Sequence, residues 1–197
     1  MEARRPDHCN CAACRAGREC SAGLERITSP LGIGDPGRQV MGRALEVISS
    51  AVPCQALGWY PVTAKGEHAA GALIRLNRPV AVDAEQARRE YVQRYHRDDP
   101  FAPRHVLDSP RPLLTMDDIG GTQGLMSTEY GRELLPECGV QWELAMYLRD
   151  GGLMLGAIRL SRTAQDGEFQ TSEVAFLERT QSALELSYNS ALRSHDA

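Results

Sequence analysis

The sequence predicts an α+β domain, a mainly antiparallel sheet with helices on one face and a long C-terminal helix. One stretch has apolar residues at period 2, as is typical of a strand with one buried face: Trp142, Leu144, Met146 and Leu148. Asp150-Gly151 follows and tolerates the positive φ angles of a tight turn, so Leu153–Arg162 is expected to return as a second strand. A third stretch has apolar residues at helical spacing: Val174, Leu177, Leu184, Tyr188 and Leu192.

Upstream of this hairpin, apolar residues at helical spacing predict a helix over 38–52, which Pro53 ends. Two strands are expected after it, over 55–62 and 70–76, with a turn at 65–68. Three more elements complete the chain: a helix over 84–96 capped by Asp83, a short strand over 113–116, and a helix from residue 127 or 128 to 135. The proline-rich segment that begins at Asp99-Pro100 is expected to cross a surface or cover a pocket.

The start of the long C-terminal helix is indicated by Glu173, an acid at the third helical position. Phe169 and Val174 lie on either side and can form a hydrophobic staple. Gln170, by contrast, is a poor N-cap residue.

Net charge and hydropathy argue against a nucleic-acid-binding, membrane or secreted protein. The 197 residues carry a formal charge of −4, which favours neither nucleic-acid nor membrane binding. No run of about 18 apolar residues occurs, and the N-terminus lacks the apolar core of a signal peptide. We therefore expect a cytoplasmic protein with no membrane partner, in which the six cysteines are thiols or metal ligands.

Residues 1–37 are expected to form a Cys-rich irregular arm ahead of a domain that spans 38–197. The arm contains four closely spaced cysteines: Cys9, Cys11, Cys14 and Cys20. Four thiolates at such spacing can bind one zinc ion or an iron–sulfur cluster, with zinc favoured. The segment CAACRAGREC is similar to the CxxC-x5-C of WhiB-type iron–sulfur regulators. The alternative is four unliganded thiols, because the gap between Cys9 and Cys11 is tight.

Several motifs follow one another in the rest of the chain. They are Y-x3-Y-x3-DP at Tyr91, Tyr95, Asp99 and Pro100, then TEYGRELLPECGV, the DGG hairpin, and RTAQDGEFQTSE before the long helix. Together they resemble the GAF-like sensory domains at the N-termini of LuxR-type bacterial transcriptional regulators, over roughly 38–193. This resemblance implies a GAF/PAS-like antiparallel sheet that holds a small ligand in a pocket, and long flanking helices that pair two subunits.

The regulators of this class continue into a DNA-binding helix-turn-helix, whereas this sequence ends at Ala197. We therefore expect either the sensory part of a longer regulator or a stand-alone relative, and no DNA binding by the chain itself. The last helix also has a second apolar face of Phe176, Ala183 and Leu186. This face predicts a homodimer through the C-terminal helix.

Five residues are candidates for ligand binding. The resemblance points to Tyr91, Tyr95 and Asp99; the two tyrosines share a helical face and Asp99 follows at its end. Trp59 and Trp142 come from predicted strands and can supply flat walls. The other three are therefore expected to border one cavity with Trp59 or Trp142 in its wall. The alternative is structural: the tyrosines pack in the core and Asp99 caps a turn. Core packing is the simpler interpretation for both tryptophans.

Catalysis has little support in the sequence. Neither G-x-S-x-G, a Walker loop, G-x-G-x-x-G nor H-E-x-x-H occurs. Cys54 and Cys138 are expected to be small buried hydrophobic residues. The sequence thus favours a non-enzymatic ligand-sensing domain. The alternative is a metal- or redox-dependent protein with its chemistry at the cysteine arm, including a thiol enzyme on a GAF scaffold, since some GAF domains reduce methionine sulfoxide through cysteines.

Overall fold

The computed structural model describes residues 35–80 and 82–195. Its helices are α2 (Pro36–Ala51), α3 (Ala84–Glu90), α4 (Gly121–Met126), α5 (Leu135–Glu137) and α6 (Thr171–His195), with π-helical turns at Tyr91–Tyr95 and Tyr130–Leu134 and 3-10 turns at Pro103–His105 and Asp117–Ile119. Its strands are β1 (Ala56–Pro61), β2 (Leu73–Leu76), β3 (Leu113–Leu114), β4 (Trp142–Asp150) and β5 (Leu153–Arg162). The α+β class is confirmed. The four cysteines of the arm lie outside the described residues.

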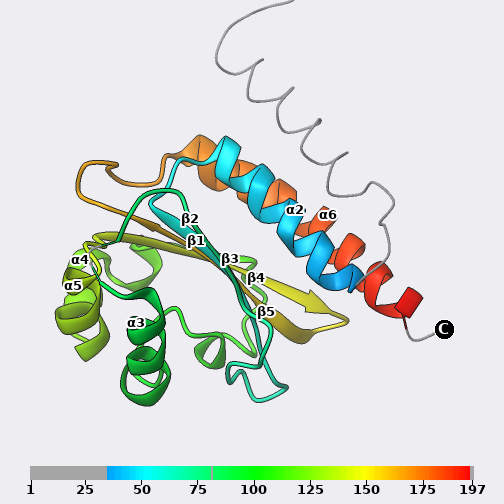
Figure 1. Cartoon of the computed structure of the whole chain (residues 1–197), viewed down its shortest axis with the longest axis horizontal. Helices are drawn as coiled ribbons and strands as arrows, with labels where there is room; N and C mark the ends of the chain where they lie inside the picture. The colour runs from blue at the N-terminus through cyan, green and yellow to red at the C-terminus, as the bar shows by residue number, and fades with distance from the viewer. Residues whose placement is uncertain (1–34, 81, 196–197) are drawn as a thin grey trace, which may run out of the picture.

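The strands form one antiparallel sheet in the order β2-β1-β5-β4-β3 (Figure 1). The predicted hairpin is confirmed: β4 pairs with β5, and positive φ angles of 56° at Gly151 and 94° at Gly152 make the turn. β5 is central because β1 and β4 pair with its two edges. Residues of β5 therefore lie in the middle of both faces of the sheet.

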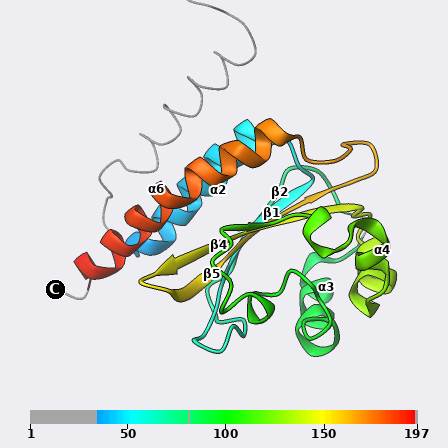
Figure 2. The same ribbon diagram turned by 180° about the vertical axis from the view of Figure 1, so that it is seen from behind.

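Two helices cover one face of the sheet. α2 and α6 lie side by side there, far apart in sequence (Figures 1 and 2). Their inward residues and one face of β4 and β5 form a continuous apolar core, which includes Met41, Ile48, Leu144, Ile158 and Leu177, each fully buried. α2 begins at Pro36, and Asp35 caps it by accepting a hydrogen bond from the Arg38 N–H.

The expectation that helices cover one face only is wrong. α3, α4 and α5 cover the second face, as Figure 1 shows. The reason is visible in β4, where Ala145 and Tyr147 are as fully buried as Leu144 and Met146. A strand with two apolar faces needs a cover on each. Tyr147 also donates its hydroxyl to the Phe101 carbonyl, which fixes the proline-rich segment on this side.

Both predicted helices on this second face are interrupted. Asp83 caps α3 as expected by accepting from the Glu85 and Gln86 N–H groups, but the helix continues as the π-helical turn Tyr91–Tyr95. The helix predicted over 127–135 is instead the turn Tyr130–Leu134 followed by α5. Pro136 has no N–H to complete an α-helical ladder here, which accounts for the widened turn before it.

Among residues 35–80 and 82–195, the helices are all too short or too polar to span a bilayer.

Candidate functional site

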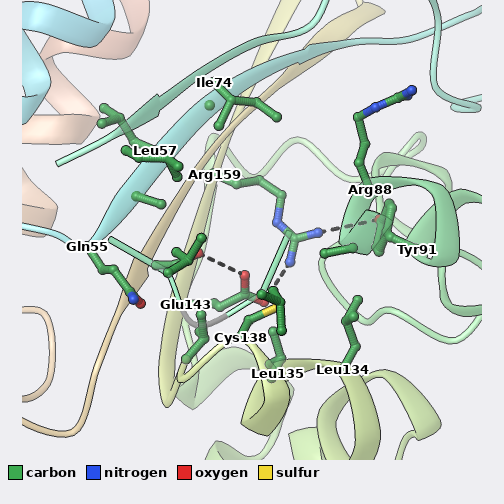
Figure 3. A pocket seen from close by; sticks show the side chains of 18 of the residues that line it. Gln55, Leu57, Ile74, Arg88, Tyr91, Leu134, Leu135, Cys138, Glu143 and Arg159 are labelled. Carbon is green, nitrogen blue, oxygen red and sulfur yellow. Dashed lines mark hydrogen bonds and ion pairs between the residues drawn. The ribbon is translucent and has the colours of Figure 1, made fainter. Parts of the chain in front are cut away.

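A cavity of 170 Å³ lies on the second face of the sheet, between β1, β2 and β5 and the helical segments α3 and α5 (Figure 3). Its walls are mostly apolar: Ile74, Leu76, Val80, Val82, Ala87, Leu134, Leu135 and Val140. Ile74 and Leu76 are exposed on the edge strand β2, at 44% and 45% of their surface, so the cavity opens to solvent beside this edge. An apolar wall around a few polar groups is the usual construction of a small-molecule site.

The pleat of β1 and β5 determines which side chains reach the cavity. Gly58 and Tyr60 line the cavity, whereas Trp59 between them turns to the face that α2 and α6 cover. Arg159 of β5 pairs across the ladder with Gly58. A Cβ atom at Gly58 would lie 2.9 Å from the Tyr60 ring, so glycine leaves room for that ring in the wall.

The polar end of the cavity is built around Arg159, which is 8% exposed and lies between two buried carboxylates. Its guanidinium forms an ion pair with Asp99, which is fully buried, and its Nη2 lies 2.6 Å from Glu143 Oε2. Figure 3 shows this side chain extended toward Glu143 on one side and Tyr91 on the other. Two carboxylates and one guanidinium give the buried cluster a formal charge of −1.

Two tyrosines complete the hydrogen bonding of these carboxylates. The Tyr91 hydroxyl donates to Asp99 Oδ2 at 2.7 Å, and the Tyr130 hydroxyl donates to Glu143 Oε2 at 2.7 Å. Asp99 Oδ1 also accepts the Phe101 N–H at 2.9 Å, so it anchors the loop after Pro100. These hydrogen bonds are required because a buried charge without partners costs much free energy.

Burial shifts the pKa values of two groups near Arg159, Glu143 and His68. It raises the pKa of the Glu143 carboxyl above its usual range, although Arg159 opposes this effect. It lowers the pKa of the His68 imidazole from 6.5 to about 4, and the charge of Arg159 adds to the shift. His68 Nε2 lies 3.3 Å from the Tyr91 hydroxyl. At neutral pH the His68 ring is therefore uncharged.

Two buried polar atoms in the cavity lining have no hydrogen-bond partner among the described residues: Arg159 Nε and Gln55 Oε1. Gln55 is 5% exposed and its Nε2 makes one long hydrogen bond, 3.5 Å, to the Pro79 carbonyl. Both atoms are shielded from solvent, so each is an unsatisfied polar atom inside the fold, where buried polar groups are nearly always satisfied.

The structure separates the five residues predicted to bind a ligand. Tyr91 lines the cavity and Asp99 lies directly behind it, joined to Tyr91 and Arg159. Tyr95 is buried in the second-face core, with its hydroxyl 3.3 Å from Glu133 Oε2. The expectation of one shared cavity fails for Tyr95 and for both tryptophans, which do not line it. Trp59 packs edge-on against Tyr188, with their ring centroids 5.4 Å apart. Trp142 borders a separate hollow near Phe169.

The site residues predicted from the sequence did not include Arg159, Glu143 or His68. A signal for two of them was present, because Arg159 and Glu143 stand in strands whose other central residues are apolar. A charged residue at such a position needs a buried partner of opposite charge. Ligand binding by Trp59, Tyr91, Tyr95, Asp99 and Trp142 stays a prediction.

Metal and thiol chemistry find no support within residues 35–80 and 82–195. No group of three or more His, Cys, Asp or Glu side chains there is arranged to hold a metal ion. Burial raises the pKa of both the Cys54 and Cys138 thiols to about 11, so both are protonated at neutral pH. The predicted ligands Cys9, Cys11, Cys14 and Cys20 fall outside this part of the chain.

No family model and no curated protein matches this chain. Solved structures do. The GAF domain of a phosphoenolpyruvate-protein phosphotransferase from Coxiella burnetii superposes with a TM-score of 0.62 at 12% identity, over 95% of this chain and 100% of that chain. Free methionine-R-sulfoxide reductase from Neisseria meningitidis gives 0.59 at 12% identity, over 98% and 99%.

A third structure is the N-acylhomoserine lactone dependent LuxR family transcription factor CepR2 from Burkholderia cenocepacia. It gives a TM-score of 0.54 at 14% identity, over 90% of this chain and 95% of that chain. At identities this low, such likenesses show the fold. The chain has the GAF-like fold shared by GAF domains and the sensory halves of LuxR-type regulators.

Proposed function

We propose that this chain is a ligand-sensing regulatory domain, either the sensory part of a LuxR-type transcriptional regulator or a stand-alone relative, that binds a small molecule in the 170 Å³ cavity. The observation that carries the proposal is an apolar cavity that opens to solvent and has the Arg159 guanidinium, with its partner Glu143, at one end. The GAF-like fold supports it as analogy. The placement of the protein in the cytoplasm is part of the same proposal.

The position of the cavity suits a sensor. Arg159 lies on β5, and the same strand ends at Arg162, whose guanidinium binds Glu173 at 2.6 Å at the start of α6. α6 covers the opposite face of the sheet from the cavity. A ligand that repositions Arg159 therefore acts on the strand whose last residue is paired with the start of the long helix.

The test is a thermal-shift screen of small metabolites on the wild-type chain and on Ala87→Phe. Ala87 lines the cavity from α3, so phenylalanine there fills the space a ligand would occupy. Ala64→Phe adds the same side chain at an exposed turn and is the matched control. A metabolite that stabilises the wild type and Ala64→Phe but not Ala87→Phe supports the proposal. A screen without any such metabolite counts against it.

We also propose that two copies associate through α6. Leu186, in the second half of α6, is 74% exposed. It borders a hollow lined by Asp150, Asn189, Ser190, Arg193 and Ser194. The predicted second apolar face is smaller than the sequence suggested, because Phe176 is 7% exposed and belongs to the core. The exposed leucine beside a hollow on one helix supports a self-complementary contact.

The second candidate function is metal binding by Cys9, Cys11, Cys14 and Cys20, with zinc favoured over an iron–sulfur cluster. The spacing of the four thiols supports it. A thiol enzyme in the described part of the chain is disfavoured by the raised pKa values of Cys54 and Cys138.

A further inference from the structure

His68 lies in the wall of the cavity between two tyrosine rings. It comes from the loop that joins β1 to β2, and its ring meets those of Tyr60 and Tyr91 edge-to-face, with centroids 5.8 Å and 5.3 Å apart. Its Nε2 lies 3.3 Å from the Tyr91 hydroxyl. These contacts hold the imidazole in one orientation, so the protonation of its two nitrogens decides what it offers to a bound molecule.

The partners of Tyr91 determine the direction of this hydrogen bond. Burial raises the pKa of Tyr91 well above its usual range, so the hydroxyl keeps its one proton. Asp99 Oδ2 lies 2.7 Å from that hydroxyl. Asp99 is fully buried and ion-paired with Arg159, and such a carboxylate can only accept. Tyr91 therefore donates to Asp99 and accepts from His68, whose Nε2 must carry the hydrogen.

The second nitrogen of His68 is consequently an open acceptor. At neutral pH the ring is uncharged and has a single N–H, so Nδ1 carries a lone pair. No described residue makes a hydrogen bond to Nδ1, and unlike Arg159 Nε this atom keeps accessible surface. The wall of the cavity thus contains an accessible acceptor that an O–H or N–H group of a bound molecule can satisfy.

The charges and the volume limit the molecule that supplies this donor. After burial, the charge of Arg159 lowers the pKa of His68 most, Asp99 opposes it and Arg88 adds to it. The two guanidinium groups also oppose a cationic ligand beside the ring, and an anionic oxygen has no proton to donate. At 170 Å³ the cavity is close to the apolar cavities of about 150 Å³ that hold a benzene molecule. An uncharged ring compound with one donor meets these limits.

We propose that His68 Nδ1 is a polar anchor of the cavity, and that the cavity selects compact, uncharged compounds of about one aromatic ring in size that donate an O–H or N–H group to it. This inference rests on the proposed function, since it names a binding residue and the ligand class of the same site. Tyr60 brings a hydroxyl to the wall beside His68, so the experiment has to separate the two.

The experiment titrates three probes of similar size into the full chain at pH 7, by ligand-observed NMR. Phenol carries the donor, toluene has the same shape without it, and benzylamine is a cationic donor. The readout is the ratio of phenol affinity to toluene affinity, because toluene reports on the apolar walls alone. Phenol is expected to bind more tightly than benzylamine.

His68→Phe isolates the acceptor, because phenylalanine keeps a ring at this position but has no lone pair. The ratio of phenol to toluene affinity should fall roughly 5–30-fold in this variant, as expected for the loss of one buried hydrogen bond. Tyr60→Phe is the matched control, since it removes the neighbouring hydroxyl, and there the ratio should stay within about threefold.

Nitrogen NMR of the imidazole tests the same inference in the wild type. The His68 signals are assigned by their loss in His68→Phe, or in His68→Gln if the first variant does not fold. The hydrogen is expected on Nε2, and the Nδ1 resonance is expected to shift when phenol binds. A hydrogen on Nδ1, or an Nδ1 resonance that saturating phenol leaves unchanged, overturns the inference.

The outcomes separate this inference from the proposed function. A ratio that falls in Tyr60→Phe instead of His68→Phe, or tighter binding of benzylamine than of phenol, overturns the inferred anchor and ligand class but leaves the cavity as a site. A metabolite that the Ala87→Phe screen assigns to the cavity, together with no binding of phenol, does the same. Failure of all three probes and of the metabolite screen overturns both.

Discussion

Arg159 brings together residues from three distant parts of the chain. Asp99 comes from the proline-rich segment, Glu143 from β4 and Tyr130 from the turn before α5. A buried arginine with two carboxylates is costly to desolvate, but once formed it is more costly to break on one side. The cluster therefore fixes how the second-face segments lie on the sheet.

We expect Arg159→Leu to lower the free energy of unfolding by about 3–5 kcal/mol, because Asp99 and Glu143 would be left buried without a cation. Urea denaturation at pH 7 measures this. Arg193→Leu is the control: its ion pair with Asp150 is at 3.1 Å, but its side chain is 74% exposed, so a change within about 0.5 kcal/mol is expected. Equal midpoints for the two variants would show that the cluster does not stabilise the fold.

His68 should make stability depend on pH. Its pKa is lowered on folding from 6.5 to about 4, so the unfolded chain binds more protons between these values. The contribution of the neutral ring is fully present above pH 6.5 and is lost as the pH falls toward 4. We expect the wild type to lose ~1–3 kcal/mol more than His68→Gln between pH 7 and pH 4. Parallel pH profiles of the two proteins in urea denaturation would contradict this.

Tyr91 and Asp99 could be found from the sequence, because the Y-x3-Y-x3-DP motif places Tyr91 on one helical face and Asp99 at the end of that face. Arg159 and Glu143 could not be paired from it. They are 16 residues apart, and only the hairpin register sets them on one face of neighbouring strands. Trp59 was misplaced for a similar reason, since a shift of one residue along β1 decides whether a side chain faces the cavity or faces α2 and α6.

At the scale of elements, local signals predicted the hairpin and α6 well. The Asp150-Gly151 turn and the alternation in β4 are properties of neighbouring residues. The two π-helical turns and the covering of both sheet faces were not predicted. Each depends on contacts between distant segments, such as the packing of Tyr147 against the Phe101 loop.

Two glycines test how tightly these elements approach. A Cβ at Gly156 would press into the Trp59 ring and lie 2.5 Å from the Tyr60 carbonyl oxygen, whereas a Cβ at Gly42 in α2 meets nothing within 4 Å. Gly156→Ala is therefore expected to destabilise the fold by about 1–3 kcal/mol through overpacking. Gly42→Ala should stabilise it by about 0.5–1 kcal/mol through helix propensity. Thermal denaturation measures both, and a stabilising Gly156→Ala would rule out close packing of β1 on β5.

At the scale of the whole molecule, the cysteine arm offers a function independent of the cavity. If Cys9, Cys11, Cys14 and Cys20 bind metal, protein purified without chelator under nitrogen should contain close to one zinc ion per chain, or show iron–sulfur absorption. Cys11→Ser with Cys14→Ser should abolish the signal, while Cys54→Ser should not. Four freely titrating thiols in metal-free wild type would contradict the site.

The cavity and α6 lie on opposite faces of the sheet, so association through α6 would leave the cavity mouth beside β2 open. One exposed leucine is ordinary on a protein surface, but Leu186 is joined by Leu192 at 37% exposure on the same helix. In a self-complementary dimer each Leu186 would face the hollow of the partner copy.

We therefore expect light scattering to show a dimer whose dissociation constant rises at least about 10-fold in Leu186→Glu, because a carboxylate would be buried at the contact. Val92→Glu is the matched control: Val92 is 41% exposed in the turn Tyr91–Tyr95, away from α6, and its substitution should leave the dimer intact. A monomer at high concentration, unchanged by Leu186→Glu, would show that α6 does not pair two copies. Equal weakening by both variants would place the contact elsewhere, since only the first carboxylate lies on α6.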